Sequence, residues 1–386
     1  VVEQNVMIPM RDGVRLATDI YRPARGGAPV TEKLPVLLQR TPYDKSGGRL
    51  REQAQLFARH GYIVALQDCR GRYKSEGVFS KYIGEGVDGH DAIEWLARLP
   101  DADGQVGMWG TSYAAHVQAG AAKTKPPHLK TIVLNMGGFY NGWDHKIRNH
   151  GAFENQQLTW AFSQLAAETA DPRVRELLKQ ENPRDWLAGL PFRKGLNPLS
   201  IVPSFEDQIL EMMTHGDYDD YWKHPDINWA EHYDRTADIP MIHVSGWYDS
   251  YCGGTIKNYA ELAKLQKSPS RLLIGPWTHG GNTRSFAGDV EFGPDAVAAD
   301  FNEGFHLRWF DHFLKSRAWN PGDDAAIRVF VMGGGSGHRL TNGRMFHGGA
   351  WRTGTRWPLP GTQFTSYYFH SDGALRREKP PAGSIA

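Results

Sequence analysis

The stretch GQVGMWGTSYAAHVQAG, residues 104–120, places the small residues Gly110, Thr111 and Ser112 between two runs of different character. The apolar run before them is typical of a buried strand, and the alanine-rich run after them has helical spacing. Ser112 therefore stands at a sharp turn from a strand into a helix. From this stretch alone, two interpretations are open: the serine is a nucleophile on a strained turn, or it caps the helix.

The chain on either side alternates between strand and helix signals. A hairpin is expected over residues 6–23, because Asp12-Gly13 favours a tight turn. The other expected strands are 34–43, 62–71, 104–110, 130–137, 239–247 and 271–276, and the expected helices are 50–61, 89–100, 112–123, 253–265 and 301–315. Nearly continuous apolar strands that alternate with helices predict an α/β fold with a mostly parallel, doubly wound sheet covered on both faces.

Two parts of the chain depart from this alternation. Over 139–238 strand-like runs vanish, so we expect a helical insertion between core segments 1–138 and 239–320. Over 321–386 short strands separated by Gly and Pro turns are typical of an all-β domain. This last segment is short for an independent sandwich and ends without a strand to close its edge. We therefore expect an incomplete domain that packs against a second copy of the chain or a complementary C-terminal fragment.

Composition excludes several classes of protein. The 44 basic residues nearly balance 43 acidic ones, so the chain lacks the basic excess of a nucleic-acid-binding protein. Its apolar runs fall far short of the roughly 20 residues that span a bilayer, and no secretory leader is visible. We expect no membrane partner and a cytoplasmic location by default. Cys69 and Cys252 cannot build a four-ligand zinc site, and no HExxH-like cluster occurs, so we expect no metal and no cofactor.

Two later strands end next to residues that would serve a nucleophilic serine. Asp249 follows strand 239–247, and His279 follows strand 271–276. The carboxyl ends of parallel strands meet at one edge of a sheet, and the order Ser, Asp, His is that of an α/β-hydrolase triad. Separately, Asp249 would be a turn acid and His279 a loop histidine. Together they predict that His279 takes the proton of Ser112 and that Asp249 orients the imidazole.

An acyl-transfer site also needs two donors for the oxyanion. The backbone N–H of Tyr113, directly after the serine, supplies one by geometry. The second should come from the loop RTPYDK, residues 40–45, which follows the strand residues LPVLLQ, 34–39, and lacks a His-Gly-Gly run. The phenol hydroxyl of Tyr43 is the candidate, and the alternative is that Tyr43 only packs.

At this point the chain resembles the cocaine esterase and X-prolyl dipeptidyl-peptidase (CocE/NonD) family of serine hydrolases. The resemblance rests on ordered motifs across residues 5–280, among them RTPYDK, QDCRGRYKSEG, DGQVGMWGTSY, GWYDSYCGGTIKNY and LLIGPWTHG. It implies an α/β-hydrolase core, a helical cap before the acid and a jelly-roll-like C-terminal domain. It also implies the triad Ser112, Asp249 and His279, with Tyr43 as an oxyanion donor. One departure is Ala115, which stands where the family motif ends in glycine.

The resemblance implies hydrolysis of a small-molecule carboxylic ester through an acyl-enzyme, with amides as a further substrate class. X-prolyl dipeptidyl-peptidase and amino-acid ester hydrolase or acylase activities stay open, as do acyl transfer and a catalytically silent binding protein. A substrate ammonium would need pocket carboxylates, for which the candidates are Glu154, Glu168, Asp217, Asp219 and Asp220, although GDYDDYW is also typical of a solvated turn. Aromatic residues instead favour a bulky apolar acyl group, and the candidates for binding it are Phe139, Trp143, Trp160 and Trp277.

Overall fold

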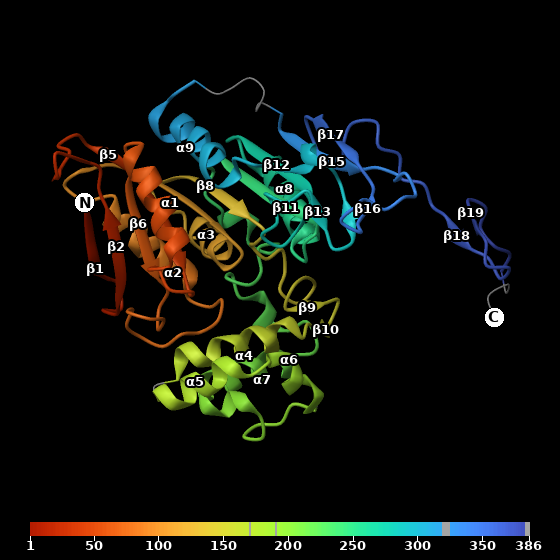
Figure 1. Cartoon of the computed structure of the whole chain (residues 1–386), viewed down its shortest axis with the longest axis horizontal. Coiled ribbons are helices and arrows are strands. Elements are labelled where there is room, and N and C mark those ends of the chain that lie inside the picture. Colours follow the sequence, from red (N-terminus) through yellow and green to blue (C-terminus); the bar gives the residue numbers. More distant parts are fainter. Residues whose placement is uncertain (170, 190, 319–324, 383–386) are drawn as a thin grey trace.

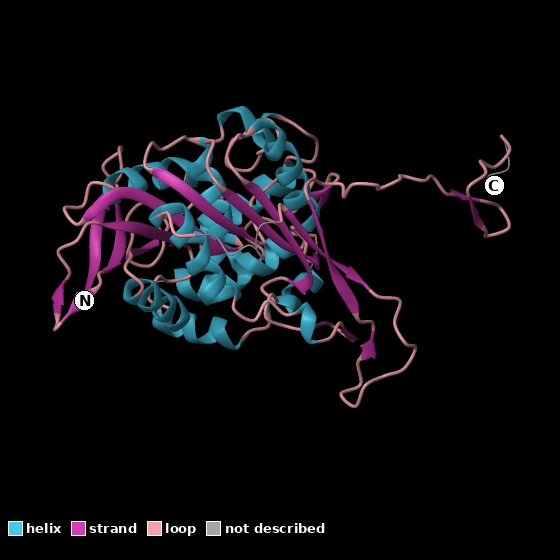
Figure 2. Cartoon of the chain, turned by 90° about the horizontal axis from the view of Figure 1, so that it is seen from above, coloured by secondary structure: helices cyan, strands magenta, loops and turns pink. Residues whose placement is uncertain are grey.

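The computed structural model describes residues 1–169, 171–189, 191–318 and 325–382. Within these residues a sheet of ten strands runs through the molecule (Figures 1 and 2). The inner strands of this sheet pair in parallel, and the strands at both of its edges pair antiparallel. In sheet order the strands are β1 (Val2–Pro9), β2 (Arg15–Tyr21), β6 (Ile63–Asp68), β5 (Leu34–Thr41), β7 (Ala102–Thr111), β8 (Leu129–Asn135), β11 (Met241–Tyr248), β12 (Ser270–Thr278), β15 (Ile327–Met332) and β17 (Gly349–Gly354).

Helices cover both faces of this sheet, which confirms the predicted doubly wound arrangement. One face carries α2 (Glu85–Leu96), α3 (Tyr113–Lys123) and α8 (Cys252–Leu265), and the other carries α1 (Gly48–Arg59) and α9 (His306–Lys315). Alternate residues of β5 show why both faces are apolar. Val36 and Leu38 belong to the core under α2 and α3, while Leu37 belongs to the core under α1 and α9. A strand buried on both faces therefore has the continuous apolar run seen in the sequence.

Between β8 and β11 the chain forms a group of helices at the bottom of Figure 1. They are α4 (Gln156–Glu168), α5 (Pro172–Gln180), α6 (Pro183–Trp186) and α7 (Pro203–Thr214), preceded by the short strands β9 (Arg148–Asn149) and β10 (Ala152–Phe153). Three of these helices begin with proline, which suits a first helical position because it has no N–H to leave unpaired. Leu158, Phe205 and Ile209 join the core of the sheet, so the inserted helices are packed onto it.

The C-terminal part contributes strands to the central sheet itself. β15 pairs in parallel with β12, and β17 pairs antiparallel with β15. Buried Ile327 and Val329 share a core with Leu272 and Ile274, so this pairing extends the core past the expected boundary at residue 320. The four-part domain division stays a prediction, and residues 319–324 lie outside the described residues.

Beyond β17 the chain leaves the body of the molecule and ends in an exposed hairpin (Figures 1 and 2). This hairpin consists of β18 (Tyr368–Phe369) and β19 (Leu375–Arg376). The remaining short strands are β3 (Ala24–Arg25), β4 (Ala28–Pro29), β13 (Phe286–Ala287), β14 (Val290–Glu291) and β16 (Met345–Phe346). None of the helices in the described part of the chain combines the length and the apolar character needed to cross a bilayer.

Candidate active site

Ser112 occupies a strained turn between β7 and α3. Its backbone has φ 63° and ψ −120°, a conformation that non-glycine residues rarely adopt. This turn can form because two residues that lie next to it in space, Gly110 and Gly137, have no side chain. A Cβ on Gly110 would lie 2.5 Å from the Cβ of Ala114, and a Cβ on Gly137 would lie 2.2 Å from the carbonyl oxygen of Ser112. The small residues that surround the serine in the sequence therefore serve to make this turn possible.

The structure also accommodates Ala115, the departure from the family motif. Ala115 is fully buried, and a Cβ placed on Gly137 would lie 2.8 Å from its methyl carbon. Because residue 137 carries no side chain, the methyl of Ala115 occupies the space between α3 and the end of β8. The turn is thus packed by one methyl group where two would clash.

Asp249 and His279 are in direct contact at the ends of two neighbouring parallel strands. Asp249 directly follows β11, His279 directly follows β12, and His279 Nδ1 lies 2.9 Å from Asp249 Oδ1. The other carboxylate oxygen accepts a hydrogen bond of 2.7 Å from the hydroxyl of buried Ser245. Both oxygens of the buried aspartate are thereby satisfied, and its orientation is fixed. Such a carboxylate holds the proton of His279 on Nδ1, which leaves Nε2 to exchange protons with a substrate.

Two sets of contacts link Ser112 to this acid–histidine pair. The backbone N–H of Ser112 donates to Asn135 O at 2.9 Å, and the Asn135 side chain donates to both Thr111 and Asn282. Asn282 lies three residues after His279. In addition, Tyr251 lines a cavity with Ser112 and stacks on the His279 ring at a centroid distance of 5.7 Å. The three predicted triad residues therefore gather at one edge of the sheet.

Tyr43 and Tyr113 lie beside Ser112 as the sequence predicts. Both line the same cavity as the serine. As the first residue of α3, Tyr113 presents one of the N–H groups that a helix leaves without an intrahelical partner. The hydroxyl oxygen of Tyr43 accepts a hydrogen bond of 3.0 Å from Trp160 Nε1, so its own proton is available for an oxyanion. Although the whole side chain is 40% exposed, burial of the hydroxyl raises the pKa of Tyr43, which keeps the phenol protonated.

The loop that carries Tyr43 is fastened to the inserted helices by a buried arginine. Arg72 Nε donates to the carbonyl of Pro42 at 2.9 Å, and its other nitrogens bind Gln164 and Glu168 of α4. Trp160, the partner of the Tyr43 hydroxyl, belongs to the same helix. The position of Tyr43 therefore depends on how α4 packs.

The ring of Tyr113 forms part of a buried network beneath the site. Its hydroxyl donates to Glu85 at 2.9 Å and accepts the backbone N–H of Tyr82 at 2.8 Å. Glu85 in turn pairs with buried Arg40 at 2.9 Å. Burial raises the pKa of Glu85 and Arg40 opposes that effect. The network holds both Tyr113, the residue after Ser112, and Tyr82 in the cavity wall.

The cavity at Ser112 is small, and two lysine side chains line it. Its volume is about 30 Å³, and its lining residues are Tyr43, Lys81, Tyr82, Ser112, Tyr113, Lys146, Gln156, Gln157, Trp160 and Tyr251. Burial lowers the pKa of Lys81 well below its usual range, and Lys146 lowers it further. Burial also lowers the pKa of Lys146, against the opposing effects of Glu154 and Asp249. The bulky apolar acyl group expected from the aromatic residues stays a prediction.

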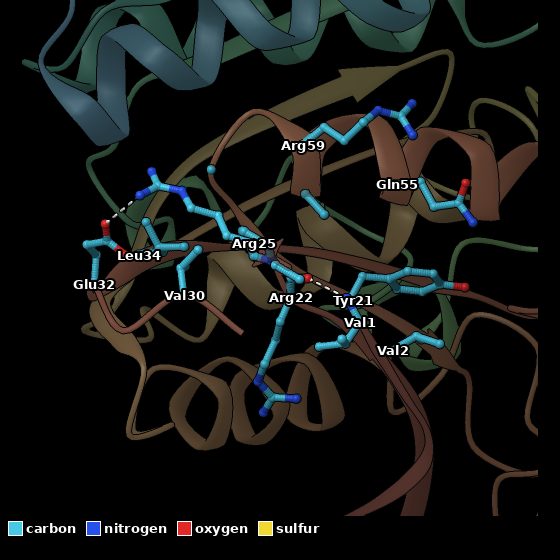
Figure 3. A pocket seen from close by; sticks show the side chains of 14 residues that line it. Val1, Val2, Tyr21, Arg22, Arg25, Val30, Glu32, Leu34, Gln55 and Arg59 are labelled. Atoms are coloured by element: carbon cyan, nitrogen blue, oxygen red, sulfur yellow. Dashed lines mark hydrogen bonds and ion pairs between the residues drawn. The ribbon is translucent and has the colours of Figure 1, made fainter. Parts of the chain in front are cut away.

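A larger hollow of about 630 Å³ lies elsewhere, between the start of the chain, β2 and α1 (Figure 3). Leu34, the first residue of β5, lines it, whereas Tyr43 follows the last residue of the same strand. The hollow is therefore at the opposite end of the sheet from Ser112. It takes no part in the site.

The chain also matches known proteins. The family model described as X-Pro dipeptidyl-peptidase (S15 family) matches residues 12–281. The chain belongs to this family. This confirms the resemblance inferred from the motifs.

Among S15 relatives, cocaine esterase from Rhodococcus sp. (strain MB1 Bresler) is 31% identical over 97% of the chain and 63% of that protein. Two solved structures have the same fold. An α-amino acid ester hydrolase has a TM-score of 0.72 and 25% identity, over 100% of this chain and 64% of that chain. An aminopeptidase from the marine sediment archaeon Thaumarchaeota archaeon has a TM-score of 0.70 and 23% identity, over 99% and 63%. The chain thus spans a little under two thirds of each of these relatives.

Only one of the four aromatic residues expected to bind an acyl group, Trp160, is among the residues that line the Ser112 cavity. Phe139 is buried behind the cavity wall, where the centroid of its ring lies 4.8 Å from that of the lining residue Tyr82. Trp143 donates to the carbonyl of Gly216 in the inserted segment. Trp277 is fully buried in the core under α1 and α9 and donates to Ala296 O. The acyl-binding role of these residues stays a prediction.

The five acids considered for an ammonium site have other positions. Glu168 pairs with Arg72, Asp219 with His215 and Asp220 with Lys223, while Asp217 is exposed. Glu154 comes nearest the Ser112 cavity, because its Oε2 lies 3.9 Å from Nζ of the lining residue Lys146. Among the residues that the structure describes, no three His, Cys, Asp or Glu side chains are grouped so as to hold a metal ion.

The sequence did not reveal that Lys81, Lys146 and Tyr251 line the Ser112 cavity. Lys81 lies in the loop before α2, and Lys146 lies in the segment before β9. A lysine in a loop is normally solvated, and no spacing in SKYIGEG or DHKIRN distinguishes these two. Only the packing of α4 against the sheet makes them buried.

Proposed function

We propose that the chain is a serine hydrolase that cleaves carboxylic esters through an acyl-enzyme on Ser112. The observation that carries this proposal is the 2.9 Å contact between His279 and buried Asp249, at the sheet edge where Ser112 stands on its strained turn. A hydroxyl is a weak nucleophile at neutral pH, and a histidine oriented by a carboxylate is what activates it.

In the proposed reaction, Ser112 Oγ attacks the ester carbonyl while His279 Nε2 takes the hydroxyl proton. Asp249 stabilises the imidazolium and keeps its tautomer. The negative charge on the former carbonyl oxygen is bound by the Tyr43 hydroxyl and the Tyr113 N–H. Collapse of this intermediate expels the alcohol, to which His279 returns the proton. Water then repeats the sequence on the acyl-enzyme and releases the acid.

The S15 relatives favour esters as the substrate class, because both cocaine esterase and the α-amino acid ester hydrolase are named for ester cleavage. Dipeptidyl-peptidase and amino-acid ester hydrolase activities stay as alternatives. They need a carboxylate for the substrate ammonium, and Glu154 is the candidate acid nearest the cavity, beside Lys146. A silent binding protein is the non-enzyme alternative, against which stands the presence of Ser112, Asp249, His279 and Tyr43.

The test is turnover of p-nitrophenyl butyrate together with labelling by a fluorophosphonate and peptide mass spectrometry. We expect the label on Ser112. Ser112→Ala should lose turnover by at least about a thousandfold while folding normally, because the step that needs the nucleophile is removed. Ser268→Ala, at a half-buried serine just before β12 and away from the Ser112 cavity, serves as the matched control. Unlabelled Ser112, or an alanine variant as active as the wild type, would refute the mechanism.

A further inference from the structure

Two lysines share the buried cavity of Ser112. Lys81 and Lys146 are each only 3% exposed, although lysine is rarely buried without an ion-pair partner. Lys81 Nζ donates to Gln157 Oε1 at 2.8 Å and lies 3.8 Å from the centroid of the Trp160 ring. Lys146 Nζ donates to Ser250 Oγ at 2.7 Å and lies 4.7 Å from the centroid of the Tyr251 ring.

Negative charge is sparse around these two lysines, and what there is acts on Lys146. No carboxylate oxygen of the described residues lies within 4.0 Å of Lys81 Nζ, and the one charge that acts on it is that of Lys146. Lys146 Nζ also donates to Gln156 Oε1, lies 3.9 Å from Glu154 and feels the charge of Asp249, whereas Lys81 has no such acidic neighbour in the described part of the chain. Buried charges are normally paired, because desolvation without a partner is costly. The cavity is therefore a site that an anion would complete.

The backbone supports the view that these positions serve a ligand. Lys146 has φ 90° and Tyr82, beside Lys81, has φ 74°, both in the left-handed region that disfavours side chains. Together with Ser112, these are three strained residues in the lining of one cavity. Strain of this kind persists where the surroundings hold a residue in a functional orientation.

The position of the cavity indicates which part of an ester would fill it. The leaving alcohol must lie beside His279, which returns its proton. The described residues that line this cavity include Ser112, Tyr43 and Tyr113 but not His279. Because the alcohol takes the position beside His279, we assign this cavity, which contains Tyr43 and Tyr113 beside Ser112, to the acyl group.

We propose that Lys81 and Lys146 bind a carboxylate at the far end of the acyl group, so that the chain hydrolyses monoesters of short dicarboxylic acids. This inference rests on the proposed esterase function and specifies its substrate class. The cavity volume of about 30 Å³ is on the scale of a carboxylate group. A bound carboxylate would also favour the charged form of both lysines, which the cavity itself disfavours.

The first experiment compares three ethyl esters of similar length that differ in terminal charge. Monoethyl succinate ends in a carboxylate, ethyl levulinate in a neutral ketone and ethyl 4-aminobutanoate in an ammonium group. Ethanol release is measured and the uncatalysed rate is subtracted. We expect kcat/KM to be at least about tenfold higher for the anion than for the ketone, the scale of a charge-assisted hydrogen bond, and lowest for the cation.

The second experiment removes each charge at nearly constant volume. Lys81→Met and Lys146→Met should bring the ratio of kcat/KM for succinate over levulinate close to one, while the levulinate rate changes much less. Lys123→Met is the matched control, since Lys123 is also a buried lysine near a tryptophan ring, at 5.4 Å from the centroid of Trp229. It does not line the Ser112 cavity and should keep the wild-type ratio.

The outcomes separate the two proposals. A wild type that labels on Ser112 but prefers the ketone or the ammonium ester overturns the carboxylate site and leaves the esterase function intact. Absence of both label and turnover overturns the esterase function and the site with it. If one methionine variant fails to fold, the order of the three esters in the wild type and the result for the other variant still decide whether the carboxylate site exists. An unchanged ratio in both folded variants also overturns the site.

Discussion

Tyr43 illustrates how one hydrogen bond can determine the chemistry of a side chain. Because Trp160 Nε1 can only donate, the Tyr43 oxygen must accept in that contact, at 3.0 Å. The phenol proton is then directed away from Trp160 and towards the cavity that it shares with Ser112. In the proposed mechanism, the indole prepares the hydroxyl as a donor before substrate arrives, which is the condition for effective oxyanion stabilisation.

Tyr43→Phe is therefore expected to lower kcat for p-nitrophenyl butyrate by about a hundredfold or more, with little change in KM, since the lost bond forms mainly in the transition state. Trp160→Phe removes only the orienting contact and should cost less. Tyr367→Phe, on the exposed C-terminal segment, is the control. A phenylalanine variant with wild-type kcat would assign the second oxyanion donor to another group.

At the scale of elements, the turn between β7 and α3 depends on the end of β8. Gly137 follows this strand, and a methyl group there would lie 2.2 Å from the Ser112 carbonyl oxygen and 2.8 Å from the Ala115 methyl. The carbonyl is backbone, so it cannot move without shifting the start of α3. The geometry of Ser112 is thus set by a contact between two strands and one helix.

Gly137→Ala should displace Ser112 and reduce kcat/KM by at least about tenfold, with a loss of unfolding free energy of about 1–3 kcal/mol, the usual cost of overpacking. Steady-state kinetics and urea unfolding measure the two effects. Gly189→Ala is the control, because a Cβ at that exposed position meets nothing within 4 Å. An alanine variant with normal activity and stability would mean that the turn is not constrained by this contact.

Sequence predicted the sheet and the positions of Asp249 and His279 because both follow apolar strands directly, and parallel strands share one carboxyl edge. It did not predict that β15 joins the sheet. A short strand among Gly and Pro turns has the same local pattern at the edge of a parallel sheet as in a separate β domain, and its pairing with β12 is a long-range contact. Lys81 and Lys146 were missed for the same reason, since their burial depends on elements distant in sequence.

At the scale of the whole molecule, three histidines are buried in different layers of the fold. His116 lies in α3, His243 in β11 and His306 at the start of α9, each at most 3% exposed. Burial lowers the pKa of His116 to about 4, that of His243 to about 3 and that of His306 to about 4. The folded chain therefore keeps these imidazoles neutral at a pH where an unfolded chain, with a histidine pKa near 6.5, would protonate them.

Stability should consequently fall as pH drops from about 6.5 towards 4, because in that window the unfolded state binds more protons than the folded state. Each histidine contributes a slope of up to about 1.4 kcal/mol per pH unit, and above pH 7 the contribution is constant. Urea unfolding at several pH values between 7.5 and 5 measures this slope. His243→Leu should reduce the slope of unfolding free energy against pH by the contribution of one histidine, because the leucine takes up no proton in either state.

A change in packing must be separated from this proton linkage. Leu262→Val removes one methylene from the core between α8 and the sheet, so it should lower the unfolding free energy by a similar amount at every pH and leave the slope unchanged. If His243→Leu also shifted stability uniformly, His243 would titrate alike in both states, and the acid sensitivity would have to arise from other groups, such as His116 and His306. A reduced slope would instead assign part of the acid sensitivity of this fold to β11, the strand that also positions Asp249.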